Sequence, residues 1–352
     1  GSFFFVIITL FWATSCQTQP SSDGEQQKAN KIIFLIGDGM GLNQVLAAMT
    51  VHDGPLALES SSHVGLQKTH PAKWYITDSA ASGTAMACGK KTKNGMIGVD
   101  SSGNALVSIL KIAEKHGLAT GLVSSSSITH ATPASFIANE ISRNNYEAIA
   151  ADFLETDVDV FIGGGLDHFT KREDGRDLTK ELEEKGYILA TSMEEVEAVK
   201  EGKLAALTAP VHNPPAAEGR KDMLPKATRK AIELLGQNEE GFFLMVEASQ
   251  IDWAGHGNDE DYLISETLDF DQVIEIAMDF AREDGETLVV VTADHETGGF
   301  VVLDGDYQKN EVKTTFTTGG HTGSLIPVFA YGPGAEYFTG IYENTGFLER
   351  FM

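Results

Sequence analysis

Apolar, largely β-branched runs alternate with helical patterns from Lys31 onward, and this alternation constrains the fold more than any other feature. The runs lack strict polar–apolar alternation, so they suit strands buried on both faces of a mostly parallel sheet. The strand runs are Ile32–Ile36, Ala119–Val123, Val158–Ile162, Phe242–Val246, Thr287–Val291 and Pro327–Tyr331. The helical patterns are Ala80–Cys88, Ala105–Lys115, Tyr146–Leu154, Lys221–Leu235 and Ile264–Arg282. This order predicts an α/β fold with a large, mostly parallel central sheet and helices on both faces.

We expect a single folded domain over residues 31–352. Residues 171–220 are more polar and irregular than the rest, and they include a Pro-rich segment, VHNPPAAEG. They are interpreted as a small surface excursion from the sheet, placed where it could cover a functional site.

Residues 1–30 are expected to lie outside the fold. Phe3–Ala13 is an apolar run too short to span a bilayer, and it resembles the core of a secretory signal. The following Ala13-Thr14-Ser15-Cys16 resembles the cleavage box of a bacterial lipoprotein, and a polar stretch suited to a tether comes next. Lipidated Cys16 would tether the protein to a membrane; a plain signal peptide is the alternative. Both predict an extracytoplasmic protein in a bacterium, either periplasmic or anchored at the outer membrane.

Charge and cysteine content add two expectations. The formal net charge of the 352 residues is −25, which repels nucleic acid, so duplex binding is not expected. A phosphate ester would also be repelled, unless bound metal ions supplied local positive charge. There are two cysteines, and Cys88 is predicted to be a small, buried, unpaired residue in a helix.

Metal-binding side chains follow several of the predicted strands. Asp38, Glu247 and Asp294-His295 each come directly after an apolar run, and Thr129–Pro133 follows another. Because the carboxyl ends of parallel strands meet at one sheet edge, these groups are expected to share a site.

Two further segments extend this pattern. Asp252 and His256 are four residues apart, so one helical turn would place them on the same face. His321 follows two glycines in GGHTG, which lets the backbone approach a ligand closely. Oxygen and imidazole ligands suit Zn²⁺ in open catalytic sites, and all-oxygen sets suit Mg²⁺.

Ser79, in TDSAASGTA, is the candidate nucleophile, because a helix is predicted to begin there. A helix N-terminus favours phosphate and an alkoxide. Spacing along the chain indicates no serine–histidine pair, so activation by a metal is the expected route.

These segments together resemble alkaline phosphatase, from about Lys31 to the C-terminus. The matching blocks come in the family's order: IGDGMG (Ile36–Gly41), TDSAASGTAMACGKKTKNGMIGVD (Thr77–Asp100), THATPAS (Thr129–Ser135), Glu247 with IDWAGH (Ile251–His256), TADHETGG (Thr292–Gly299) and GGHTG (Gly319–Gly323).

The resemblance implies two Zn²⁺ ions and one Mg²⁺ ion. The first Zn²⁺ would be held by Asp252, His256 and His321, and the second by Asp38, Asp294 and His295 beside Ser79. The Mg²⁺ would be held by Asp38, Thr132 and Glu247, with His130 as a ligand or near-ligand. Arg143, in ISRNNYEA, matches the arginine whose planar fork grips phosphate.

The implied activity is hydrolysis of small phosphate monoesters. Ser79 would take the phosphoryl group, the phosphoserine would then be hydrolysed, and the leaving group would matter little. The chain departs from one bacterial pattern, because His130 stands where some members have aspartate and Trp253 where some have lysine.

Other functions stay open at this point. A phosphodiesterase or phosphomutase of the same superfamily is one alternative, and a catalytically silent lipoprotein that binds metal or phosphate is another. A sulfatase is disfavoured, because Ser79 is not followed by the Pro and Arg of a sulfatase context. The short interval from His295 to His321 leaves no room for a large dimerisation insert, so a homodimer is compatible with the sequence but not indicated.

Overall fold

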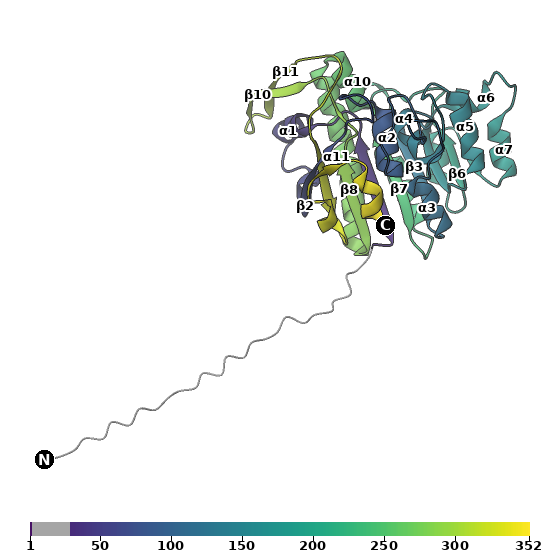
Figure 1. The fold of residues 1–352 in the computed structure, drawn as a ribbon, viewed down its shortest axis with the longest axis horizontal. Coiled ribbons are helices and arrows are strands. Elements are labelled where there is room, and N and C mark those ends of the chain that lie inside the picture. The colour runs from purple at the N-terminus through teal and green to yellow at the C-terminus, as the bar shows by residue number, and fades with distance from the viewer. Residues whose placement is uncertain (2–28) are drawn as a thin grey trace.

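A twisted central sheet organises the molecule, whose computed structural model describes residue 1 and residues 29–352 (Figure 1). Within these residues ten strands form one sheet. Their order across the sheet is β14 (Gly340–Glu343), β2 (His63–Lys68), β13 (Ile326–Tyr331), β8 (Thr287–Thr292), β1 (Lys31–Gly37), β7 (Phe242–Ala248), β3 (Ala119–Ser127), β4 (Val160–Gly164), β6 (Leu204–Leu207) and β5 (Ile188–Ala190).

The sheet is mostly parallel, as predicted. Only β13 runs against its neighbours β8 and β2 among these ten strands. Each of the six predicted strand runs overlaps a strand of this sheet. The predicted α/β fold with a large, mostly parallel sheet is therefore confirmed.

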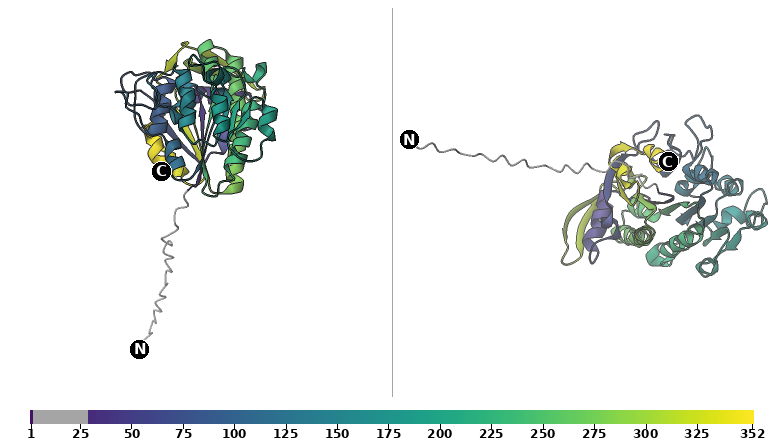
Figure 2. Two further views of the ribbon diagram at one scale, coloured as in Figure 1. Left: turned by 90° about the vertical axis from the view of Figure 1, so that its right-hand side faces the viewer. Right: turned by 90° about the horizontal axis from the view of Figure 1, so that it is seen from below.

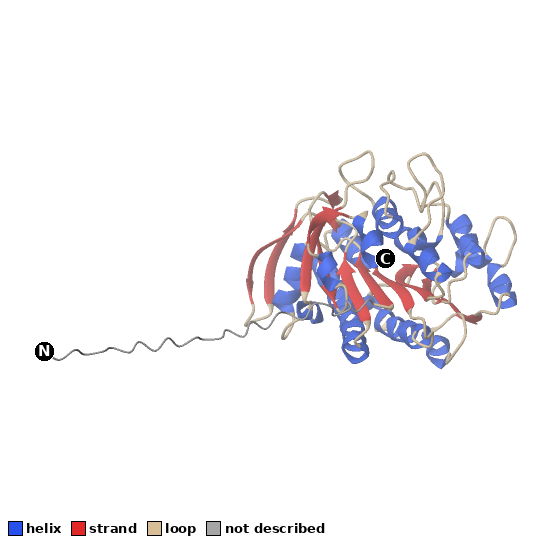
Figure 3. Cartoon of the chain, turned by 60° about the horizontal axis from the view of Figure 1, so that its bottom comes forward, coloured by secondary structure: helices blue, strands red, loops and turns tan. Residues whose placement is uncertain are grey.

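Helices cover both faces of the sheet (Figure 2, Figure 3). Side chains alternate along β1, so Ile33 and Leu35 enter one apolar core while Phe34 and Ile36 enter the other. The first core packs against α1 (Leu42–Val51), α8 (Met193–Ala198), α9 (Met223–Leu235), α10 (Gln250–Gly257) and α11 (Glu260–Asp284). The second packs against α2 (Ser79–Cys88), α3 (Ile109–Lys115), α4 (Ala131–Ile137), α5 (Tyr146–Glu155), α6 (Leu166–Thr170), α7 (Leu178–Glu184) and α12 (Gly346–Phe351).

Two sequence predictions need correction. The helix predicted over Ala105–Lys115 begins only at Ile109, because the side chain of Ser108 accepts a hydrogen bond from the Lys111 N–H and caps it. The segment 171–220, expected as an excursion from the sheet, supplies β5 and β6, which extend the sheet beyond β4. These strands were missed because each is only three or four residues long.

Two small antiparallel pairs lie outside the main sheet. The hairpin of β10 (Phe300–Asp306) and β11 (Glu311–Phe316) stands at the upper left of Figure 1. The pair β9 (Glu296–Thr297) and β12 (His321–Thr322) is shorter. Because His321 lies opposite Thr297 in this pair, β12 returns the chain to the end of β8 after the hairpin.

The remaining expectations concern Cys88 and the N-terminal segment. Cys88 is buried and unpaired at the end of α2, as predicted, and burial raises the pKa of its thiol to about 12. The signal-like run and Cys16 lie outside the described residues. In the described part of the chain, no helix combines the length and apolar character that crossing a bilayer requires.

Candidate active site

The site forms where four neighbouring parallel strands end. β8, β1, β7 and β3 are adjacent in the sheet, so their carboxyl ends meet at one edge. Asp38 follows β1, Glu247 is the second-to-last residue of β7, and Asp294 follows β8. All three carboxylates are completely buried. The edge therefore concentrates negative charge away from water, which is costly unless cations bind there.

Ser79 lies beside the first group of ligand-type residues, Asp38, Asp294 and His295. Its Oγ is 3.4 Å from Oδ2 of Asp38 and 3.3 Å from Nε2 of His295. Ser79 is the first residue of α2, and Asp78 caps this helix by accepting a hydrogen bond from the Ala81 N–H. The hydroxyl thus sits at a helix N-terminus, where partial positive charge favours an oxyanion.

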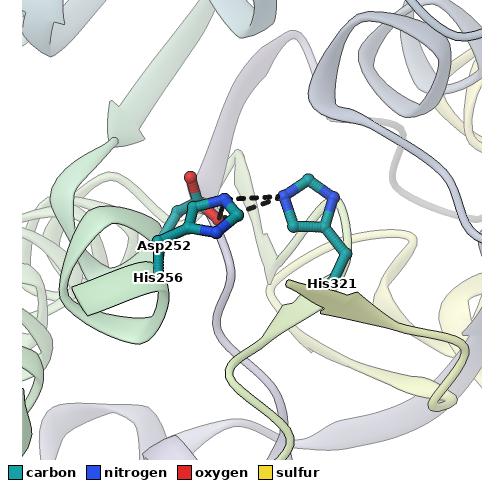
Figure 4. A group of neighbouring side chains, drawn as sticks. All are labelled: Asp252, His256 and His321. Carbon is teal, nitrogen blue, oxygen red and sulfur yellow. Dashed lines mark hydrogen bonds and ion pairs between the residues drawn. The ribbon is translucent and has the colours of Figure 1, made fainter. Parts of the chain in front are cut away.

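Asp252, His256 and His321 form a second group (Figure 4). Asp252 and His256 project from α10, and His321 faces them from β12. The Nε2 atoms of the two histidines are 3.1 Å apart, and each is 3.4 Å from Oδ1 of Asp252. Burial and the Asp252 carboxylate act in opposite directions on His321, and the carboxylate prevails, so the pKa of His321 is raised.

Three histidines in these two groups are oriented in the same way. Nδ1 of His256 donates to the Gly319 carbonyl, and Nδ1 of His321 donates to the Thr77 carbonyl, each at 2.8 Å. A carbonyl can only accept, so in the neutral rings Nε2 is left with a free lone pair. The Nδ1 of His295 lies 3.2 Å from the Thr297 hydroxyl, which leaves Nε2 of His295 toward the serine. This arrangement is typical of metal-binding histidines, in which a hydrogen bond fixes one ring nitrogen and the other faces the metal.

Asp38, His130 and Glu247 form a third group, whose ligand-type atoms all lie within 4.8 Å of one another. His130 Nδ1 is 4.0 Å from Oε1 of Glu247. His130 directly precedes α4, and Thr132 follows it two residues later in the first turn of this helix. The Thr132 side chain is buried. Asp38 belongs to both the first and the third group.

Buried polar atoms without a hydrogen-bond partner test whether these residues suit metal ions. Five atoms of the predicted ligands have no such partner among the described residues: Oδ1 of Asp38, Oδ2 of Asp294, Oε1 of Glu247, Nδ1 of His130 and Oγ1 of Thr132. Burial, together with the charges of Asp294, Asp252 and Glu247, raises the pKa of Asp38 well above its usual value. Bound cations would satisfy these atoms and remove the repulsion between carboxylates, so the residues fit a multinuclear metal site.

Arg143 reaches this site from the loop before α5. Its Nη1 lies 3.2 Å from Oδ2 of Asp78, and its Nη2 lies 3.4 Å from Nε2 of His130. Burial would lower the pKa of Arg143, but Asp78 and Asp38 outweigh that effect and raise it. The guanidinium therefore lies between Asp78, the residue before Ser79, and His130.

Sequence patterns missed two residues that the structure places at the site. Thr297 donates from Oγ1 to Oδ1 of Asp252, and His212 accepts a hydrogen bond at Nδ1 from the Ser127 N–H at 3.1 Å. The His212 ring lies edge-to-face against Trp253, with ring centres 4.9 Å apart, and it also contacts His130. His212 comes from the Pro-rich segment, so that segment does reach the site, although no motif marks this histidine.

Comparison with known proteins identifies the family. A family model described as alkaline phosphatase matches residues 29–309. The chain is 35% identical to alkaline phosphatase 3 of Bacillus subtilis, over 93% of this chain and 89% of that relative. It is 32% identical to the alkaline phosphatase of Escherichia coli, over 94% of this chain and 87% of the relative.

Solved structures agree with these relatives. The alkaline phosphatase from the Antarctic bacterium TAB5 is 42% identical, with a TM-score of 0.89 over 92% of this chain and 97% of that chain. A histidine-to-aspartate mutant of the TAB5 enzyme, with Mg bound in its M3 site, matches with a TM-score of 0.88 at 42% identity over 93% of this chain and 98% of that chain. The chain therefore belongs to the alkaline phosphatase family and is an enzyme of that family.

Proposed function

We propose that the protein hydrolyses small phosphate monoesters through a phosphoserine at Ser79, with a broad range of leaving groups. The observation that carries this proposal is the position of the Ser79 hydroxyl. It lies within 3.4 Å of Asp38 and 3.3 Å of His295, at the start of α2 and beside buried ligand-type atoms that have no hydrogen-bond partner in residues 29–352. A serine in this environment can be held as an alkoxide near neutral pH.

The three groups of residues are proposed to hold two Zn²⁺ ions and one Mg²⁺ ion. Asp252, His256 and His321 would hold one Zn²⁺, and Asp38, Asp294 and His295 the other. Asp38, Glu247 and Thr132 would hold Mg²⁺, with His130 in or next to that site. When bound, such ions supply positive charge that stabilises the entering and leaving oxygens of an in-line displacement.

His130 is proposed to influence which ion the third group takes. An imidazole suits transition metals, whereas Mg²⁺ prefers oxygen ligands. The Mg-bound histidine-to-aspartate mutant of the TAB5 enzyme supports testing the same exchange here as His130→Asp. We expect this variant to bind Mg²⁺ more tightly than the unaltered protein in a calorimetric titration.

The chain's own residues would take the following roles in the phosphoryl transfer. Arg143 and the N-terminus of α2 bind the non-bridging oxygens of the phosphate. Ser79 loses its hydroxyl proton to solvent and its Oγ forms a bond to phosphorus, while the bond to the leaving oxygen breaks on the opposite side and that oxygen takes up a proton from water. Water then attacks phosphorus, the Ser79 O–P bond breaks, and inorganic phosphate is released. Two in-line displacements give net retention at phosphorus.

A broad leaving-group range follows from the exposure of one side of the site. The His256 side chain is 42% exposed, whereas Asp38, Asp294 and His295 are fully buried. The alcohol would therefore depart toward solvent, so the site would accept alcohols of different sizes.

Trapping the intermediate tests the proposal. The enzyme, loaded with Zn²⁺ and Mg²⁺, is mixed with an aryl phosphate and quenched in acid, and its peptides are sequenced by mass spectrometry. Phosphate is expected on Ser79 alone. Hydrolysis that inverts the configuration at a chiral phosphorus, with no phosphorylated serine, would exclude the covalent route. Parallel assays with a phosphate diester should show far slower hydrolysis, as a monoesterase requires.

A further inference from the structure

The segment Lys73–Ile76 ends three residues before Ser79 and exposes three large apolar or aromatic side chains. Trp74 is 57% exposed, Tyr75 is 76% exposed and Ile76 is 36% exposed. Consecutive exposed side chains of this kind, next to an active site, indicate a surface that binds something. Tyr75 lies four residues before Ser79, so their Cα atoms are at most about 14 Å apart.

The backbone of this segment is fixed even though its side chains are exposed. The Ala72 N–H donates to the Thr92 carbonyl at 2.8 Å, and Asn94 Nδ2 donates to the Ile76 carbonyl at 3.0 Å. The Thr77 carbonyl accepts from Nδ1 of His321, which ties the segment to the second group of ligand-type residues. Little further ordering would be needed for this surface to bind a ligand.

Tyr75 rests against Gly323, two residues after His321. A Cβ atom on Gly323 would lie 2.3 Å from Cε1 of Tyr75, so only a glycine allows the ring to occupy this position. The Tyr75 ring therefore lies at the rim of the site that contains Asp252, His256 and His321. The His256 side chain of this group is 42% exposed, so the open side of the site, toward which the leaving alcohol would depart, lies at this group.

The two neighbouring rings differ in what already covers them. Lys73 Nζ lies over the Trp74 ring, 4.8 Å from its centre. No aromatic ring in residues 29–352 stacks on Tyr75, so a face of this ring is available for a planar partner.

We propose that Tyr75 binds the leaving group of the substrate by stacking, and that the enzyme prefers phosphate monoesters whose leaving group carries a planar aromatic ring, such as a nucleoside. This inference rests on the proposed monoesterase function and names a substrate class for it. Stacking of a base on an aromatic side chain strengthens binding by about tenfold or more, and it tolerates different bases.

A matched pair of substrates tests the proposal. Adenosine 5′-monophosphate and ribose 5-phosphate share the same type of leaving oxygen and differ in the base. The ratio of their kcat/KM values is expected to be about ten in favour of the nucleotide. Tyr75→Ala should bring this ratio close to one by lowering kcat/KM for the nucleotide only, whereas Tyr75→Phe should preserve it.

Tyr307→Ala is the control, because Tyr307 is also highly exposed but lies in the turn of the β10–β11 hairpin. It should leave both kcat/KM values unchanged. A Tyr75→Ala enzyme with an unchanged ratio of the two kcat/KM values would overturn the stacking role, even if both values fell equally. If the ratio is unchanged and light scattering shows that Tyr75→Ala halves the molar mass, this surface is an interface between two copies. If the unaltered enzyme hydrolyses neither ester, both the proposed function and this inference are overturned.

Discussion

Thr297 Oγ1 donates a hydrogen bond to Oδ1 of Asp252 at 2.5 Å, and the same oxygen lies 3.2 Å from Nδ1 of His295. A threonine hydroxyl has one proton, so it must accept from His295 if it donates to Asp252. One buried side chain thereby sets both the orientation of a carboxylate in one group and the tautomer of a histidine in another.

Thr297→Val is therefore expected to weaken metal binding about 10- to 100-fold, because the ligands lose the partner that orients them. Competition with a chelating dye measures this affinity. Thr297→Ser keeps the hydroxyl and should bind metal nearly as well as the unaltered protein. Equal affinity in the valine variant would show that Thr297 does not orient the ligands.

Ser79→Ala should lower kcat for an aryl phosphate by about a thousandfold or more, because it removes the hydroxyl that lies beside Asp38 and His295. Metal content, measured by atomic emission, should persist. Ser265→Ala is the matched control and should keep full activity, because the Ser265 hydroxyl on α11 donates to the Tyr262 carbonyl of its own helix. Normal turnover in Ser79→Ala would remove this serine from the mechanism.

Arg143→Ala should reduce kcat/KM about 10- to 100-fold, which corresponds to losing hydrogen bonds to a charged phosphate. Arg143→Lys keeps the charge but loses the planar fork, so we expect an intermediate value. Arg176, whose ion pair with Glu181 lies at the surface, provides the control variant Arg176→Ala. An Arg143→Ala enzyme with unaltered inhibition by inorganic phosphate would contradict a phosphate-binding role.

Removal of divalent cations should destabilise the fold as well as stop turnover, because the buried carboxylates then repel each other. Restoring a cation to about 1,000 times its Kd should increase the free energy of unfolding by about 4 kcal/mol. Thermal unfolding with a chelator, and after adding back Zn²⁺ and Mg²⁺, measures this difference. Identical melting curves would argue against ions bound at the buried carboxylates.

A buried ion triad supports the Pro-rich segment that carries His212. Arg220 Nη2 donates to Glu266 at 2.6 Å and to Asp269 at 2.7 Å, and the Ala216 N–H donates to Glu266 at 2.8 Å. Burial raises the pKa of Asp269 to about 6 despite its contact with Arg220.

Arg220→Met should lower the free energy of unfolding by about 3–5 kcal/mol, since it leaves two buried carboxylates without their cation. Chemical denaturation measures this loss. Replacing all three members by apolar residues, as Arg220→Met with Glu266→Leu and Asp269→Leu, should recover much of the stability. A single variant as stable as the unaltered protein would show that the carboxylates are not held as ions.

Six strands of the central sheet could be predicted from sequence because they are continuous apolar runs, whereas β2, with the mixed sequence HVGLQK, could not. The edge strand β14 and the strands β5 and β6 could not, since they have three or four residues each and no distinctive pattern. Helix α1 was also missed, because Gly41 provides no side-chain cap at its start. The antiparallel direction of β13 depends on how the chain returns from the β10–β11 hairpin, which no local pattern specifies.

In the candidate site, too, some residues could be predicted from the sequence and others could not. Acidic and imidazole residues at strand ends stand out in the sequence, and the structure brings them into three groups. Thr297 and His212 act through contacts with residues far away in the chain, 45 residues for Thr297 and Asp252 and 85 for His212 and Ser127. Threonine and histidine at such positions carry no local signature, so only the three-dimensional arrangement reveals them.

The sharing of Asp38 between two groups of ligands has a thermodynamic consequence. A cation that occupies one group alters the charge and the orientation of this carboxylate, and hence the affinity of the other group. Such coupling is reciprocal, so the second ion must change the affinity for the first by the same factor. The enzyme would then fill these positions as a linked pair, and its response to scarce metal would differ in steepness from that of independent sites.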